Sequence, residues 1–220
     1  MSMERKRQAV KRTRSYDSSG RVAAAERSRS AVLDAAERLF LSDGYGATTM
    51  SAIAELAGVS VEMIYKGFGG KPGLVRAIRD RGLAGTKREA AELRSDRMRA
   101  AETDPRALIA NWGRLGAEVA PRVSPILLLV RAAAGVDGEM ATLQQEMDAD
   151  RLRRMTENAR HLQKAGHLRR GVTLAHAADV LWTYSSPELY EMLVLRRGWT
   201  VSRYGRFIAD AMIAALLPSA

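Results

Sequence analysis

The stretch from Ala54 to Lys71, AELAGVSVEMIYKGFGGK, constrains the fold of this 220-residue chain more than any other segment. Good helix formers run up to Gly58, stop there, and resume at Ser60, which predicts two short helices joined by a tight turn. Gly58 tolerates a positive φ, and the Ser60 hydroxyl is suited to cap the second helix. Two helices held at a fixed, steep angle are therefore expected.

The residues on both sides of this turn fit a helix-turn-helix. Ala54 supplies a small contact where the helices cross, and Ile53, Val59 and Ile64 supply an apolar clamp. The second helix of such a pair is narrow enough to enter a DNA major groove and read base edges. An ordinary helical hairpin in an all-helical core has the same spacing and stays open as the alternative.

The net charge of +10 favours a polyanionic partner, either nucleic acid or an anionic membrane surface. The alternative is a solvated surface that is simply basic. Residues 1–100 carry 20 basic against 12 acidic side chains, whereas residues 101–220 carry 15 against 13. An anionic partner is therefore expected to meet the first half of the chain.

Several classes of protein are disfavoured by the composition. The chain has no cysteine, which excludes disulfides and thiolate sites and fits a reducing cytoplasm. No apolar run approaches the roughly 18 residues that a bilayer span needs. Neither a metal-type histidine spacing, nor a glycine-rich phosphate loop, nor a nucleophile elbow is present. A cytoplasmic protein without catalysis, cofactor, metal or membrane partner is therefore expected.

Beyond residues 1–24, which resemble a basic disordered tail, the pattern is helical throughout and contains no alternating strand pattern. The tail either lies along DNA phosphates or is a solubilising extension. The prolines are expected to separate helices. The helices are expected at residues 26–42, 49–56, 60–66, 71 to the high 90s, 105–119, 123–134, 138–165, 173–185, 187–197 and 200–217.

The segments AVLDAAERLF, GYGATTMSAIAELAGVS and IYKGFGGKPGL resemble the TetR family of bacterial transcriptional regulators over residues 28–75. The resemblance implies an all-α chain with a helix-turn-helix DNA-binding domain at residues 25–70. A larger helical domain for ligand binding and dimerisation would occupy residues 71–220. The implied function is a ligand-responsive repressor that binds a palindromic double-stranded DNA operator as a homodimer. A non-specific or architectural DNA-binding protein without a small-molecule inducer is the alternative.

The resemblance also assigns roles in DNA binding. Thr49, which caps the second helix, and the Tyr65 hydroxyl would each contact a phosphate. Lys71, at a helix N-terminus, would hold another phosphate, and Arg29 is a weaker candidate. Lys66 is the best candidate for a guanine contact. The residues expected to face the bases are Ser60, Val61, Glu62, Met63 and Lys66.

Two positions depart from the family pattern. Met63 stands where a small hydroxyl residue is usual, and it either contacts a thymine methyl group or packs inward. Gly67 stands where His or Tyr is usual, which removes a phosphate contact and loosens the helix end. For Tyr65 the alternative to a phosphate contact is a half-buried position in the core.

The C-terminal half is expected to dimerise and to bind an effector. The last helix, SRYGRFIADAMIAALL, is apolar nearly all round and is covered either by a second copy, together with residues 176–184, or by the protomer itself. Arg131 and Glu118 either meet a charged ligand or lie on the surface, and Arg151, Arg153 and Arg154 are expected on a solvated helix face. Met and aromatic residues line adaptable cavities but are equally core residues. The pocket candidates are Trp112, Leu115, Met140, Leu143, Met147, Met155, Trp182 and Tyr184.

Overall fold

The computed structural model describes residues 19–85 and 89–219, and these segments form helices and no strand. The expected all-α class is therefore confirmed. Of the predicted tail, residues 1–18 lie outside the described segments, and residues 19–24 are helical. The helices are α1 Ser19–Asp43, α2 Met50–Ala57, α3 Val61–Phe68, α4 Lys71–Ala84, α5 Ala91–Ala101, α6 Pro105–Ala134, α7 Gly138–Lys164, α8 Leu174–Tyr184, α9 Pro187–Tyr190, the π-helix η2 Glu191–Arg196, and α10 Val201–Leu216.

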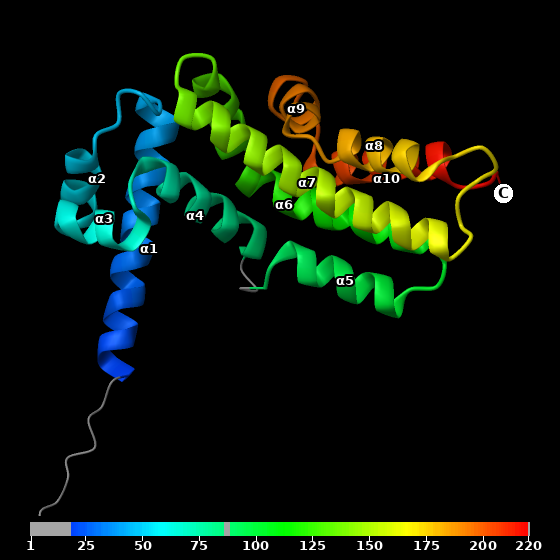
Figure 1. Cartoon of the computed structure of the whole chain (residues 1–220), viewed down its shortest axis with the longest axis horizontal. Helices are drawn as coiled ribbons and strands as arrows, with labels where there is room; N and C mark the ends of the chain where they lie inside the picture. Colours follow the sequence, from blue (N-terminus) through cyan, green and yellow to red (C-terminus); the bar gives the residue numbers. More distant parts are fainter. Residues whose placement is uncertain (1–18, 86–88, 220) are drawn as a thin grey trace, which may run out of the picture.

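Helices α1 to α4 gather at one end of the molecule, and α8 to α10 lie toward the other (Figure 1). The long helices α6 and α7 connect the two ends, and α7 packs on α6 and α8. The N-terminal half of α1 projects beyond the rest of the molecule (Figure 1). Within the described segments, no helix is both long and apolar enough to cross a membrane.

Four of the predicted helix boundaries are wrong. The helix expected from residue 26 begins at Ser19. The helix expected from residue 71 to the high 90s ends at Gly85, whose φ of +60° breaks the helix before α5. The segment 187–197 divides into α9 and η2. The two helices expected on either side of Pro121 form the single helix α6. Pro121 and Pro125 lie one turn apart, so the missing N–H groups fall on one face while buried side chains hold the opposite face.

The turn between α2 and α3 has the geometry that the sequence predicts. Gly58 adopts a left-handed conformation with φ of 67° and ψ of 34°. The N–H of Val59 donates to the carbonyl of Ala54 at 3.0 Å, and the Ser60 hydroxyl accepts the N–H of Met63 at 3.2 Å. Both ends of the turn are therefore satisfied by local hydrogen bonds.

The buried apolar residues form two clusters. The first contains Phe40, Ile53 and Ile64 from the N-terminal helices and extends into α6 and α7 through Ile126 and Leu143. The core around α2 and α3 is therefore continuous with the start of α7. The second cluster fills the space between α6, α7, α8 and α10, and its fully buried members include Leu108, Leu162, Leu181 and Leu216.

Candidate nucleic-acid interface and internal cavity

Helix α3 is held by one face and exposes the other. Ile64 is its one buried residue and has no exposed surface. Met63 and Tyr65 are 49% and 52% exposed, so neither packs into the core. Glu62 in the first turn and Lys66 in the last turn are also exposed and suit the helix dipole. This surface combines donors, a cation and an apolar methionine on a helix narrow enough for a major groove.

The two capping residues are also exposed. Thr49 accepts the N–H of Ala52 at 3.1 Å, and Ser60 caps α3 as described above. Because each hydroxyl only accepts in its cap, its own O–H is available to donate to a phosphate. Val61 is only partly exposed, so it contributes less to this surface than its neighbours.

Two residues that were expected to contact phosphates, Lys71 and Arg29, interact with groups of the protein itself. The Lys71 ammonium donates to the carbonyls of Tyr45 at 2.6 Å and Thr48 at 3.0 Å. The guanidinium of Arg29 lies 4.6 Å from the centre of the Phe68 ring. Lys71 is thus directed toward the turn between α1 and α2, and away from the exposed face of α3.

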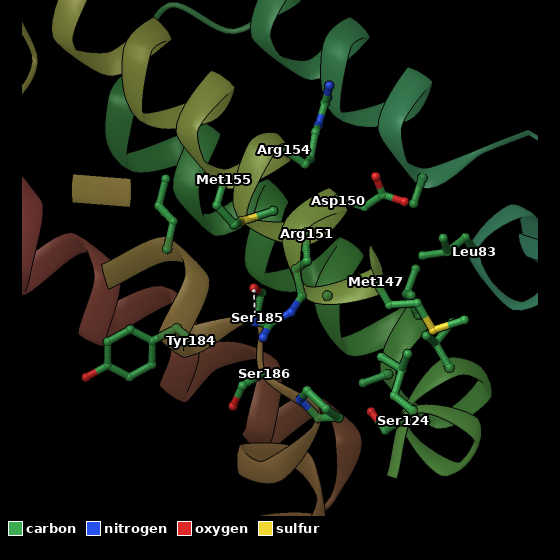
Figure 2. A pocket seen from close by; sticks show the side chains of 18 of the residues that line it. Leu83, Ser124, Met147, Asp150, Arg151, Arg154, Met155, Tyr184, Ser185 and Ser186 are labelled. Atoms are coloured by element: carbon green, nitrogen blue, oxygen red, sulfur yellow. Dashed lines mark hydrogen bonds between the residues drawn. The ribbon is translucent and has the colours of Figure 1, made fainter. Parts of the chain in front are cut away.

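A partly open cavity of about 260 Å³ lies among the helices from α4 to α10 (Figure 2). Five of the predicted pocket residues line it: Trp112, Leu115, Met147, Met155 and Tyr184. Most of the surface of the wall is apolar, although charged and polar side chains also line it, which suits a mainly apolar molecule that carries polar groups.

Three predicted pocket residues lie elsewhere. Met140 and Leu143 are buried in the first cluster, because the first turns of α7 pack against the N-terminal helices. The ring of Trp182 lies under the guanidinium of Arg151 at 4.3 Å and does not line the cavity. The spacing of apolar residues along α7 could not show that only the part of the helix after Leu143 lines the cavity.

The arginines of α7 differ from the expected solvated face. Arg153 is exposed, but the side chains of Arg151 and Arg154 are only 16% and 12% exposed, and both line the cavity. Arg151 donates to the carbonyl of Trp182 at 2.6 Å and to the Ser185 hydroxyl at 3.2 Å (Figure 2). Burial lowers the pKa of Arg151. Helices α5 and α8 cover these side chains, which their charge pattern did not reveal.

Charged groups around the cavity occur as pairs. Asp148 accepts from Arg151 at 3.2 Å, and Asp150 lies 3.4 Å from Arg79. Arg131, which was expected to meet a ligand or lie on the surface, lines the cavity and pairs with Glu188 at 2.8 Å. Glu118 is not part of the lining and pairs with Arg94.

Two buried donors beside the cavity lack a hydrogen-bond partner among the described residues: Nε1 of Trp112 and Nε of Arg154. Buried donors without a partner are rare and costly. An acceptor atom of a bound molecule is one group that could satisfy them after a small side-chain adjustment.

Three carboxylates, one each on α5, α6 and α7, predict a loss of stability in acid. Hydrogen bonds from Arg154, Arg94 and Arg153 lower the pKa values of Asp96, Glu118 and Asp150, respectively. A group whose pKa is lower in the folded state stabilises the protein above its unfolded pKa of about 4 and loses that contribution as pH falls further.

For partly exposed pairs the contribution is at most about 1 kcal/mol each, or about 2–4 °C in Tm. Thermal unfolding should therefore show Tm falling between about pH 5 and pH 3. The variant Asp96→Asn should show a weaker pH dependence than the wild type. A Tm that is constant over this range would contradict the role of these pairs.

The comparison with known families identifies the N-terminal region. Residues 32–78, which contain α2, α3 and most of α4, match the family described as bacterial regulatory proteins, tetR family. This segment therefore matches the TetR family. The match includes the turn at Gly58, the exposed face of α3 and Lys71.

Two regulators of Pseudomonas putida are 45% identical to this chain over 56 residues. They are the HTH-type transcriptional regulator TtgR and the probable HTH-type transcriptional regulator ArpR. The aligned segment is 26% of this chain and 27% of each relative. The chain thus spans about a quarter of the length of the relatives that it matches in sequence.

Solved structures share the fold over most of the chain. SmeT in its complex with triclosan is 23% identical, with a TM-score of 0.68 over 87% of this chain and 92% of SmeT. NalD of Pseudomonas aeruginosa, the secondary repressor of the MexAB-OprM multidrug efflux pump, is 19% identical, with a TM-score of 0.69 over 89% and 100%. At these identities, the likeness shows the fold over most of the chain.

Proposed function

We propose that this TetR-family protein is a sequence-specific DNA-binding repressor whose affinity for its operator is controlled by a small molecule in the cavity. The observation that carries the proposal is helix α3, which is anchored by Ile64 and exposes Met63, Tyr65 and Lys66. Lys66 would bind a guanine, Met63 would contact a thymine methyl group, and the Tyr65 hydroxyl would bind a phosphate.

The cavity supports control by a ligand. Arg79 and Leu83 of α4 line it, and α4 follows directly after α3. A ligand that contacts α4 can therefore change where α3 lies, but only through a difference in affinity for the two arrangements. SmeT is known in complex with triclosan, and FadR of Bacillus subtilis in complex with stearoyl-CoA. The apolar wall of this cavity fits a mainly apolar effector.

A homodimer on a palindromic operator completes the proposal. The protomer itself covers one face of α10, where Gly205 and Ala209 meet α6. The opposite face exposes Phe207, which makes edge contacts with the rings of Tyr184 and Trp199. A second copy would cover this aromatic surface, and two-fold symmetry would then place two copies of α3 on two half-sites.

The first experiment is fluorescence anisotropy with DNA from just upstream of the gene, beside a scrambled duplex and a salt titration. Binding only to the upstream DNA, with two protomers per site, would support the proposal. Equal and steeply salt-dependent binding to both duplexes would favour a non-specific or architectural role for this region. Release of the operator by an apolar compound would then test the cavity.

Lys66→Ala tests whether α3 is the reading helix, the helix that contacts the bases. It should weaken operator binding by about tenfold or more, the scale of one lost base contact. Tyr65→Phe should weaken binding to all duplexes alike, because a phosphate contact carries no sequence information. Lys164→Ala, which removes an exposed lysine at the far end of α7, serves as the control. Unchanged specific binding by Lys66→Ala would show that the proposed contacts of α3 are wrong.

A further inference from the structure

The ammonium group of Lys71 is surrounded by groups of its own chain. An ammonium carries three N–H donors. Two donate to the carbonyls of Tyr45 and Thr48, at 2.6 and 3.0 Å. The nitrogen also lies 4.2 Å from the centre of the Tyr45 ring, within the range of a cation–π contact. Its capacity for hydrogen bonds and its charge are thus both used inside the protein.

The carbonyls that Lys71 binds belong to a turn that is itself tightly held. The side chain of Thr48 is buried, and its hydroxyl lies 2.8 Å from the carbonyl of Gly44 and 3.1 Å from that of Leu39. The next residue, Thr49, is the N-cap of α2. Lys71 therefore fixes the backbone just before α2 begins.

The ring of Tyr45 extends this contact into the core. It is 5% exposed and packs against Phe40, with 5.5 Å between the ring centres. Burial, together with Asp137 and Glu139 at the start of α7, raises the pKa of Tyr45 to about 12. Lys71 thus joins α4 to a ring that also faces the beginning of α7.

The position of Lys71 in the chain links its contact with the turn before α2 to the position of α3. Lys71 is the first residue of α4, and only Gly69 and Gly70 separate it from the end of α3. These glycines have φ values of 76° and 136°, which leaves the connection short but free of side chains that could fix it. A cation at a helix N-terminus is also unfavourable unless its charge is satisfied elsewhere.

We propose that Lys71 is a positioning residue for the reading helix and not a phosphate ligand. It ties the start of α4 to the turn before α2, so that α3 is held between two fixed points. The inference rests on the proposed DNA-binding function and concerns how that function is built. Removing Lys71 should therefore weaken operator binding through the loss of order in the free protein.

The salt dependence of operator binding distinguishes the two roles. Removal of a phosphate ligand should lower the slope of log Kd against log salt by about 1, because one fewer counterion is released. Lys71→Met should instead weaken binding by about tenfold at every salt concentration with an unchanged slope. Lys66→Met, which removes the exposed cation assigned to a guanine, is the comparison variant. It should weaken binding to the operator more than binding to a scrambled duplex, whereas Lys71→Met should weaken both.

The variant Lys71→Gln provides a second comparison. Its amide can still donate toward the two carbonyls, although the side chain is shorter and carries no charge. We expect it to bind the operator more tightly than Lys71→Met does. Two neutral variants with equal affinity and an equally lowered slope would show instead that Lys71 is a phosphate ligand.

Amide hydrogen exchange without DNA makes the inference independent of the operator. Lys71→Met should increase the exchange rates of residues 44–52, whereas Lys66→Met should leave them unchanged. Unchanged exchange in Lys71→Met would overturn the inference. If the wild type bound no DNA specifically, the proposed function would fail, while hydrogen exchange would still decide whether Lys71 holds the turn.

Discussion

Replacing Ile64 by alanine is expected to lower the free energy of unfolding by about 3 kcal/mol, within the range for buried Ile→Ala changes. Ile64 has no exposed surface and is the one buried residue of α3. The eight residues of α3 cannot form a stable helix alone, because isolated helices of this length are marginal in water. Loss of the Ile64 anchor should therefore abolish operator binding as well.

Thermal unfolding followed by circular dichroism and by tryptophan fluorescence measures this effect. The three tryptophans are Trp112, Trp182 and Trp199, so fluorescence reports on the C-terminal half. The transition followed by circular dichroism should shift further than the one followed by fluorescence, since the lesion lies in the first cluster.

The adjacent variant Met63→Ala is the control for Ile64→Ala. Met63 is 49% exposed, so its removal should change stability by no more than about 0.5 kcal/mol. It should alter which operator sequence is preferred if the side chain contacts a thymine methyl group. Wild-type stability in Ile64→Ala would mean that α3 is not held on the core by this residue.

The helix-turn-helix of α2 and α3 was predictable because the sequence features that form it are local. The glycine at 58 and the caps at Thr49 and Ser60 depend on neighbours within four residues, and the structure has the expected hydrogen bonds at each. The exposure of Met63 and Tyr65 excludes the alternative that these side chains pack into the core. The proposed role of Lys71 was not predictable in this way, since its contacts lie 23 and 26 residues away along the chain.

The cavity was only partly predictable, for a related reason. Met140, Leu143 and Met147 lie on one face of α7, but only Met147 reaches the cavity. Which of these residues reaches the cavity depends on how far along α7 the contact with the N-terminal helices extends. The spacing of apolar residues in the sequence does not show this. The burial of Arg151 and Arg154 likewise depends on neighbouring helices that their local charge pattern does not reveal.

The crossing of α6 and α10 gives the second large effect. Gly113 and Gly205 lie at this crossing, and both are buried. A Cβ added to Gly113 would lie 2.7 Å from the Cβ of Ala209 and 2.8 Å from the carbonyl oxygen of Gly205. Because the second obstacle is backbone, the helices would have to separate. Gly113→Ala should therefore lower stability by about 2 kcal/mol, as overpacking in a core does, even though alanine favours the helix.

Gly116→Ala in the same helix is the matched control for Gly113→Ala. Its added Cβ would approach only the Cδ1 atom of Ile208, at 3.3 Å, and the end of that side chain can move. The helix-forming preference of alanine should then dominate, so that stability is unchanged or rises by up to about 1 kcal/mol. Chemical denaturation of both variants measures the difference. Equal stability of the two variants would mean that α6 and α10 do not approach as closely as the structure shows. A loss of stability confined to Gly113→Ala would show that the close contact between the two helices is at Gly113, where the second cluster lies beside the cavity.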